Sequence, residues 1–513
     1  MIRAARLAAF GAAPQGTQYV RRTVCFGSTT MRPVYRPGRA ARRLPVVEEA
    51  TTPGGWPRHA TRAERRALGK AARDALPLAG LAGAGDADRD PLAIVSAGDG
   101  DRLAWLLPIR YGRMAADPFA FFRGAASLMA HDCADLPRSG LEVQLCGDAH
   151  LLNFGVFGSP ERALVFDLND FDETLPGPFE WDVRRLAASM VLAARSRGLK
   201  PKRQREVALL AARRYRTAMA EFAELTALET WHAQVEVDER IPEIADEDWR
   251  RYAQRVADRA RGKDHLQAVA RFTEVVDGQR RIVAEPPLIV PLRDLVEILP
   301  DDDVEGLIRS VFLTYRASVR DDVRVLLDRY TYVDSAVKVV GVGSVGTRCV
   351  IVLLQGADED DLLFLQVKEA TPSALEPHLG ASAYTHPGQR VVAGQRLMQS
   401  ASDAFLGWAD GPLGRHYYWR QLRDWKGSAE VERMDAKLLG LYGSLCGWTL
   451  AKAHARSGDR VAIAAYLGSS ERFEEALAAY AVAYADRAEA DHAMLVAAVR
   501  DGRVAAEAGM AAG

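Results

Sequence analysis

Apolar side chains recur every three or four residues through most of the first 330 positions, the spacing of helices that bury one face. This spacing predicts helices at 61–75, 118–131, 179–195, 203–228, 246–260 and 304–327. Thr61 begins the first with T-R-A-E, a capping-box pattern, and Pro118 begins the second, where helices accept proline. Residues 80–101 are rich in Gly and Asp and predict a loop. Two short apolar runs, 141–145 and 163–167, predict strands on either side of a turn.

The pattern changes after residue 330. Residues 331–370 alternate, are rich in Val, Ile and Leu, and contain Gly turns, which predicts a β meander. Helical spacing returns at 388–400, at 430–456 and in the C-terminal segment. Two short strands are expected between these helices, at 404–408 and 416–422. The sequence therefore predicts an α+β fold.

These changes divide the chain into four parts. Residues 1–47 contain nine Arg and no Asp or Glu, which transit peptides can also show. We expect instead a disordered tail or a misplaced start, with Met31 as the true first residue. Residues 48–330 are expected to form a mostly helical lobe with an acidic loop, and 331–425 a β-rich unit. Residues 426–513 are expected to form helices that pack on the helical lobe.

The composition and net charge of the chain argue against some classes of function. Of the 513 residues 48% are apolar and 26% charged, and the net charge of −1 gives no general attraction to nucleic acid or anionic membranes. Apolar runs fall short of the roughly 20 residues of a membrane span. The five cysteines form no C-x-x-C pair, which argues against a disulfide framework or structural zinc. We expect a cytoplasmic protein without nucleic-acid or membrane partners, of undetermined oligomeric state.

Acidic side chains gather near the ends of the first two predicted strands. The sequence reads V-Q-L-C-G-D-A-H-L-L-N-F-G, then L-V-F-D-L-N-D-F-D-E-T, then F-E-W-D-V-R-R-L-A. Its polar members are Asp148, Asn153, Asp167, Asp170, Asp172 and Asp182. Neighbouring carboxylates repel each other and need a cation or a shared proton. Mg²⁺ suits such a set, because it binds one or two carboxylates together with substrate phosphate oxygens.

Asp148 and Asn153 have the spacing D-x-x-x-x-N, which kinases use in the catalytic loop. Gly147–Asn153, the strand ending in Asp167, and Trp181-Asp182-Val183 together resemble the catalytic core of aminoglycoside-phosphotransferase-like kinases. Their pattern is a Gly-Asp-x-His-x-x-Asn loop, a strand ending in Asp, and a helix carrying Asp-Leu-Ala.

This resemblance implies ATP and Mg²⁺ as cofactors and an unidentified hydroxyl compound as acceptor. It implies Asp148 and His150 as catalytic residues, and Asn153, Asp167 and Asp170 as metal ligands. One position departs from the pattern, because Cys146 stands where these loops usually carry His.

Most of the chain, from about Arg110 to Tyr466, is also similar to a bacterial family called domain of unknown function 2252. The strings that carry this similarity are PFAFFRGAA, QLCGDAHLLNFG, FDLNDFDETLPGPFEWD and ASDAFLGW. The family resemblance is specific, but it implies no particular activity.

A glycine-rich turn lies in the predicted meander. Residues 337–368 read as a strand, a G-x-G-x-x-G turn, a second strand, a hairpin, and a third strand that ends near Lys368. A strand rather than a helix follows the glycines, which disfavours a dinucleotide-binding fold. The candidate phosphate-binding residues are Gly341, Gly343, Ser344, Gly346 and Lys368. A plain hairpin is the alternative.

The elements after this turn resemble a kinase small lobe in their order: a helix, two strands, and the linker Arg423-Asp424-Trp425. In kinases that lobe precedes the catalytic loop, whereas here it follows. We therefore expect a circularly permuted, protein-kinase-like two-lobe fold, with Lys368 near Asp167 and Glu376 as the partner of Lys368. Arg123, in the apolar string F-F-R-G, is expected to grip phosphate or to pair with one of the acids.

Several interpretations remain open from the sequence. Besides phosphoryl transfer, the same acids suit a nucleotidyltransferase, a metal-dependent phosphoester hydrolase, or a nucleotide-binding module without catalysis. Gly-Asp and Asn also serve as ordinary turn and cap residues. We expect Asp182 to accept loop N–H groups rather than to do chemistry, and Asp172 and Glu173 to be solvated turn residues.

Overall fold

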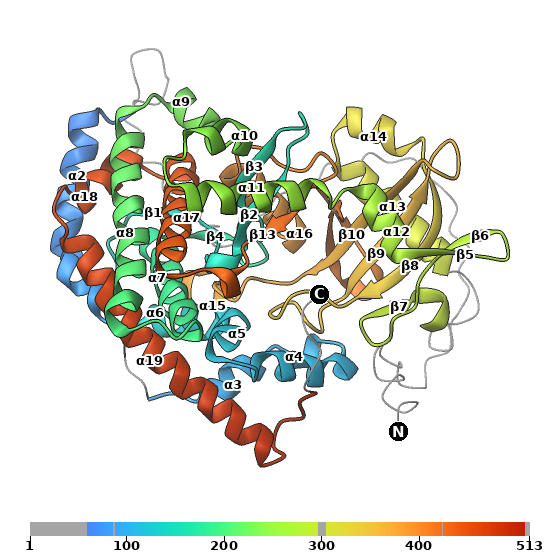
Figure 1. The fold of residues 1–513 in the computed structure, drawn as a ribbon, viewed down its shortest axis with the longest axis horizontal. Helices are drawn as coiled ribbons and strands as arrows, with labels where there is room; N and C mark the ends of the chain where they lie inside the picture. Colours follow the sequence, from blue (N-terminus) through green and yellow to red (C-terminus); the bar gives the residue numbers. More distant parts are fainter. Residues whose placement is uncertain (1–58, 86–87, 296–303, 423, 508–513) are drawn as a thin grey trace, which may run out of the picture.

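A computed structural model describes residues 59–85, 88–295, 304–422 and 424–507, and structural statements refer to these residues. The predicted tail at 1–47 and Arg423 of the predicted linker lie outside them. The fold is α+β, as predicted, with long helices on one side and a large antiparallel sheet on the other (Figure 1). None of the described helices is both long and apolar enough to span a bilayer.

The helical side is built around α7, Phe179–Ser196, which is buried along nearly its whole length. Helix α8 packs against α7, α17 and α19, and α18 packs against α2. The helices of this side are α2 Arg62–Ala75, α3 Pro91–Ser96, α4 Leu107–Met114, α5 Pro118–Arg123, α6 Ala126–Ala134, α8 Pro201–Glu224, α9 Ala227–His232, α10 Val237–Arg240, α11 Glu247–Arg261, α17 Ala436–Ser457, α18 Arg460–Leu467 and α19 Arg472–Arg500. The capping box predicted at Thr61 is present at the start of α2.

Two small sheets sit among these helices. Strand β1, Glu142–Leu145, pairs with β4, Leu175–Pro178. Strands β2, Phe154–Gly158, and β3, Leu164–Leu168, form a hairpin, and β13, Gly427–Ser428, extends it beside β2. The sequence predicted β1 and β3 but not β2 or β4. Glycine in FGVFG, and glycine and proline in LPGP, weaken the strand signal of these short sequences, and each is paired with a partner strand in the structure.

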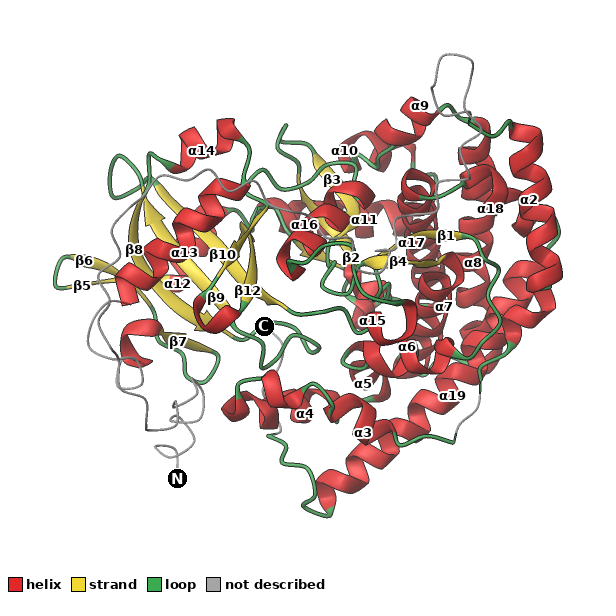
Figure 2. Cartoon of the chain, turned by 180° about the vertical axis from the view of Figure 1, so that it is seen from behind, coloured by secondary structure: helices red, strands yellow, loops and turns green. Residues whose placement is uncertain are grey.

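The large sheet has six antiparallel strands in the order β11-β12-β10-β9-β8-β7 (Figure 2). Its strands are β7 Ile289–Pro291, β8 Thr331–Lys338, β9 Cys349–Gln355, β10 Leu362–Ala370, β11 Gly407–Asp410 and β12 His416–Gln421. The predicted meander is confirmed as β8, β9 and β10. Strand β7 and the small hairpin of β5, Thr273–Val276, and β6, Gln279–Ile282, lie in a segment that the sequence predicted to be helical.

Helices cover both faces of the large sheet. The helices of this side are α12 His265–Phe272, α13 Val304–Ser318, α14 Asp321–Leu327 and α16 Pro387–Met398. The short helix α15, Glu376–Leu379, instead contacts α6 and β4 on the helical side. On one face Tyr315 of α13 stacks on Trp419 of β12 with ring centroids 4.5 Å apart. On the other, Phe272 of α12 packs edge-on against Phe364 of β10. Helix α16 contacts both the sheet and α17, so it joins the two sides.

Three predicted elements need correction. The helix predicted at 118–131 is broken between α5 and α6, because Ala125 has non-helical dihedral angles (φ −123°, ψ 46°). The predicted loop at 80–101 contains α3, which begins at Pro91 and is capped by the Asp90 side chain. The helix predicted at 304–327 is two helices, α13 and α14.

Candidate active site

The loop after β1 is held in shape by backbone constraints and by Asp182. Gly147 has φ +85°, and a Cβ there would lie 2.4 Å from the carbonyl oxygen of Glu173. The Asp182 carboxylate accepts hydrogen bonds from the backbone N–H groups of Cys146 (2.7 Å) and Gly147 (3.0 Å). The predicted role of Asp182 is thereby confirmed. His454 lies 3.3 Å from the same carboxylate, so it supports the loop from the core.

The side chain of Asp148 extends from this loop and lies beside a buried arginine. Its Oδ1 accepts a hydrogen bond of 2.7 Å from Nε of Arg185 on α7. Arg185 is itself fixed, since it lies 3.8 Å over the ring of Phe122 and donates to the Phe122 carbonyl. Burial raises the pKa of Asp148, while Arg185 and Arg123 act to lower it. The site therefore contains an oriented carboxylate that is a stronger base than a solvated one.

His150 and Asn153 complete the loop. The Asn153 side-chain amide donates 2.7 Å to the backbone carbonyl of Asp148, which leaves the Asn153 side-chain oxygen as an acceptor. His150 Nε2 lies 3.8 Å from Oδ2 of Asp148. Burial, followed by the charges of Arg123 and Arg185, lowers the pKa of His150 far below its usual value, so the ring is neutral.

Asp167 lies apart from these residues. It is 2% exposed and its Oδ2 lies 2.5 Å from Nζ of Lys452 on α17. The backbone N–H of Ser400 donates to the same oxygen (3.1 Å). The metal role predicted for Asp167 stays a prediction, and its carboxylate is already paired.

Asp170 and Asp172, just after β3, meet Lys368 of β10. Lys368 Nζ lies 2.6 Å from Asp172 Oδ2 and 3.9 Å from Asp170 Oδ1. Tyr418 also donates to Asp172 (2.6 Å). Burial acts to lower the pKa of Lys368, but the two carboxylates outweigh it and the pKa is raised well above its usual value. The expectation that Asp172 is a solvated turn residue is wrong.

The pKa values of the two aspartates move in opposite directions. Burial and the charge of Asp172 raise the pKa of Asp170, although Lys368 opposes the rise. Burial works to raise the pKa of Asp172 too, but Lys368 and Tyr418 lower it overall. Asp172 is thus the carboxylate that pairs with Lys368. The negative charge of Asp170 is less fully balanced by neighbouring positive charges.

The glycine-rich turn between β8 and β9 lies against the helical side. Arg113 donates to the Gly341 carbonyl (2.5 Å) and Arg102 to the Gly343 carbonyl (2.9 Å). Ser344 Oγ lies 3.4 Å from Asp172 Oδ2. Gly346 adopts φ +92° and accepts a hydrogen bond from the backbone of Leu103 (2.7 Å). These contacts join the turn to the elements that precede the loop after β1.

Two further predicted residues face the same space. The pairing of Glu376 with Lys368 is wrong, because Glu376 caps its own turn at Ser373 N (3.1 Å) and its nearest described cation is Arg390, at 3.9 Å. Arg123, at the end of α5, is half-buried, and its Nε has no hydrogen-bond partner among the described residues. Burial lowers its pKa, and Asp148 is the counter-charge that opposes this most strongly.

A cleft of about 760 Å³ brings these groups together. Its lining comes from both halves of the chain and includes Arg123, Asp148, His150, Asn153, Asp170, Asp172, Gly341, Gly343, Ser344 and Glu376. The carboxylate and amide oxygens fit a hard divalent cation such as Mg²⁺, and the arginines of the lining, Arg123 among them, fit phosphate oxygens. The cleft is therefore a candidate site for a metal-bound polyanion.

The sequence analysis did not single out Gln366 and Arg420. They lie with Tyr418 on the Lys368 face of the sheet, where Arg420 donates to Gln366 (2.9 Å). They could have been recognised in the sequence as polar residues at alternate positions of largely apolar strands. Nearby, Lys426 has its pKa lowered to about 7, first by Arg420 and then by burial. The only sequence feature that pointed to Arg185 was its position in a largely apolar helix.

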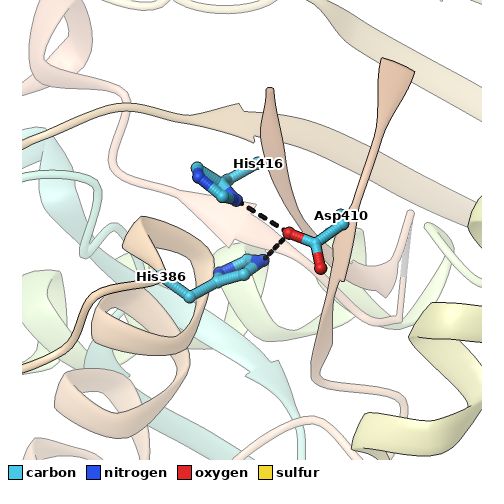
Figure 3. A group of neighbouring side chains, drawn as sticks. All are labelled: His386, Asp410 and His416. Atoms are coloured by element: carbon cyan, nitrogen blue, oxygen red, sulfur yellow. Dashed lines mark hydrogen bonds and ion pairs between the residues drawn. The ribbon is translucent and has the colours of Figure 1, made fainter. Parts of the chain in front are cut away.

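A second polar cluster lies away from the cleft, at His386, Asp410 and His416 (Figure 3). Asp410 Oδ1 lies 3.0 Å from His416 Nδ1 and 3.4 Å from His386 Nε2. His386 Nδ1 also accepts a hydrogen bond from the backbone of Gln389 and caps α16. A neutral His386 then carries its proton on Nε2, toward Asp410. A protonated Nε2 cannot bind a metal ion, so this arrangement argues against a metal centre at the cluster.

Comparison with known proteins gives one match. The model of a family described as uncharacterized protein conserved in bacteria (DUF2252) matches residues 102–498. No curated protein and no solved structure matches the chain significantly.

Proposed function

The chain belongs to the DUF2252 family, and within this uncharacterized family we propose that it is an ATP- and Mg²⁺-dependent phosphotransferase with a permuted, kinase-like fold. Its acceptor is a hydroxyl compound that the chain does not identify. The proposal assigns nucleotide binding to the large sheet and the glycine-rich turn, and phosphoryl transfer to the loop after β1.

One observation carries the proposal: Lys368 lies 2.6 Å from Asp172 although 196 residues separate them. Asp172, the partner of the sheet lysine, thereby lines the same cleft as the glycine-rich turn, the D-x-x-x-x-N loop and Asp170. A strand lysine, a glycine-rich loop, a catalytic Asp, a loop Asn and an Asp after a strand are the parts that protein kinases use. Asp182, which holds the loop by two N–H groups, supports the same interpretation.

We assign the metal to Asn153 and Asp170 rather than to Asp167. Asn153 has a side-chain oxygen available, and Asp170 lies in the cleft, whereas Asp167 is paired with Lys452. When bound, Mg²⁺ would neutralise charge on the phosphate oxygens. Lys368 would then contact phosphate with Asp172 as its anchor, and Arg123 would supply a second cation.

In this proposal Asp148 acts on the acceptor. The bond between the γ-phosphorus and its bridging oxygen breaks, the acceptor oxygen bonds to phosphorus, and the hydroxyl proton passes to Asp148. Arg185 fixes the direction of the carboxylate by its 2.7 Å hydrogen bond. Neutral His150 adds no charge beside the base.

A contact between the end of the large-sheet half and the helical side supports the permuted order of the two halves. Strand β13, which directly follows the large-sheet half, pairs with β2 of the catalytic hairpin.

Analysis of the nucleotide product tests the proposal. Purified protein with Mg²⁺ and ATP should form ADP, with transfer to an acceptor or slowly to water. Asp148→Asn should lower this rate by a factor on the order of 10²–10⁴ without loss of nucleotide binding. Asp410→Asn, a change of the same kind far from the cleft, is the control. AMP as the product, or equal rates for both variants, would contradict the assignment.

A further inference from the structure

A second cavity, of about 880 Å³, lies on the other side of the β2–β3 hairpin. Helices α10 and α11 cross over the hairpin there, and α17 and α8 complete the walls (Figure 1). Its wall residues include Val256, Leu445, Trp249, Tyr252, Tyr442 and Trp448. Volume and lining are those of a small-molecule site, because such sites span roughly 300–1,000 Å³ and are mostly apolar and aromatic. We call it the apolar cavity.

The polar groups of the apolar cavity already have partners. The Tyr252 hydroxyl accepts a hydrogen bond from the backbone of Glu430 (3.0 Å). The Ser444 hydroxyl donates to the Gly440 carbonyl (2.9 Å). A polar ligand would therefore have to compete with existing hydrogen bonds.

The charges at the rim are paired with each other. Arg214 lies 2.6 Å from Glu221, and Arg240 lies 2.8 Å from Glu243. A charged ligand would lose its hydration without gaining an uncommitted counter-ion. The paired charges at the rim therefore disfavour the binding of a charged ligand.

We propose that the apolar cavity binds a neutral, largely apolar small molecule. Burial of its surface against the aromatic walls supplies the affinity. This site is separate from the catalytic cleft, with which it shares no lining residue.

The apolar cavity is connected to the catalytic loop through Tyr442. The Tyr442 hydroxyl donates to the carbonyls of Leu151 (2.9 Å) and Phe154 (3.0 Å), on either side of Asn153. A ligand packed on the Tyr442 ring restricts this residue and so orders Asn153. Ligand and nucleotide then strengthen each other's binding by the same factor. This coupling, unlike the site itself, rests on the proposed function.

A matched pair of fluorophores tests the site in the full-length protein. N-phenyl-1-naphthylamine is neutral, and 1-anilinonaphthalene-8-sulfonate has the same rings with one negative charge. The neutral probe should bind saturably at one site, at least about tenfold more tightly than the charged one, the discrimination that roughly 1.4 kcal/mol gives. No saturable binding, or tighter binding of the anionic probe, would overturn the proposal.

Cavity-filling variants locate the binding. Val256→Trp and Ala253→Phe should each weaken binding of the neutral probe at least about tenfold, while Val496→Trp at an exposed position of α19 should not. Two fillings are used so that one misfolded variant, detected by circular dichroism, leaves the other informative. Unchanged affinity in a folded filling variant would place the probe elsewhere and refute the site. Probe binding that is insensitive to Mg²⁺-ATP would refute only the coupling.

Discussion

At the residue scale, burial and a few paired charges decide what each side chain of the cleft can do. Asp148 follows β1 and Asp167 lies near the end of β3, yet one faces the cleft beside Arg185 and the other is enclosed with Lys452. The sequence marks both as carboxylates at strand ends. It could not separate them, because the distinguishing partners come from α7 and from α17, which is about 285 residues away.

Arg185 should set the pH dependence of the reaction. Asp148 acts as a base only when ionised, so the rate should rise with pH through its pKa, which burial has raised. Arg185 favours the ionised form, so Arg185→Ala should raise that pKa further and shift the acidic limb of the kcat profile to higher pH. Arg185→Lys, which keeps the charge, should shift it less. An acidic limb that stays in place in Arg185→Ala would show that Arg185 has no such role.

The Lys452–Asp167 pair should behave as a structural ion pair. Lys452→Met leaves the buried Asp167 carboxylate without its cation and should reduce the free energy of unfolding by about 3–5 kcal/mol. Replacing both, as Lys452→Met with Asp167→Leu, should recover most of the loss. Urea unfolding of the two single variants and the double variant measures the coupling. Additive losses would contradict direct pairing.

At the element scale, strongly periodic segments were predictable and short paired strands were not. Helices α7, α8 and α17 follow from their apolar spacing, and β8 to β10 from alternation. Strands β2 and β4 exist because a neighbour pairs with them, which the local sequence does not encode. The break between α5 and α6 escaped prediction although Gly124, a poor helix former, is the C-cap of α5 and lies at the break.

His386 should contribute to the fold as the cap of α16 rather than as a metal ligand. His386→Ala removes the acceptor for Gln389 N–H and should cost about 1 kcal/mol of unfolding free energy. His386→Asn keeps a capping acceptor and should recover most of it. Chemical denaturation with and without Zn²⁺ checks both points. Stabilisation of the wild type by Zn²⁺, absent in His386→Asn, would instead show a metal site.

At the scale of the whole molecule, the site is assembled by the arrangement of the two halves. The sequence indicated that an acidic loop and a glycine-rich turn exist, and their order led us to expect a permutation. It could not supply the contacts that join them: Asp172 to Lys368, and Arg102 and Arg113 to the turn. Glu376 was expected to pair with Lys368 because the two residues are close in sequence. The charge of Lys368 is instead balanced by Asp172, which belongs to the other half of the chain.

Because the two halves of the chain meet at the cleft, we expect one nucleotide to contact residues of both halves. Thermal unfolding with and without Mg²⁺-ATP measures this on the wild type, Asp170→Ala, Lys368→Met and the control Lys437→Met on the surface of α17. A ligand at 100 times its Kd stabilises the wild type by about 2.7 kcal/mol. We predict this shift for the wild type and the control, and its loss in both cleft variants. A shift retained in Lys368→Met, or absent from the wild type, would contradict a nucleotide site shared by the two halves.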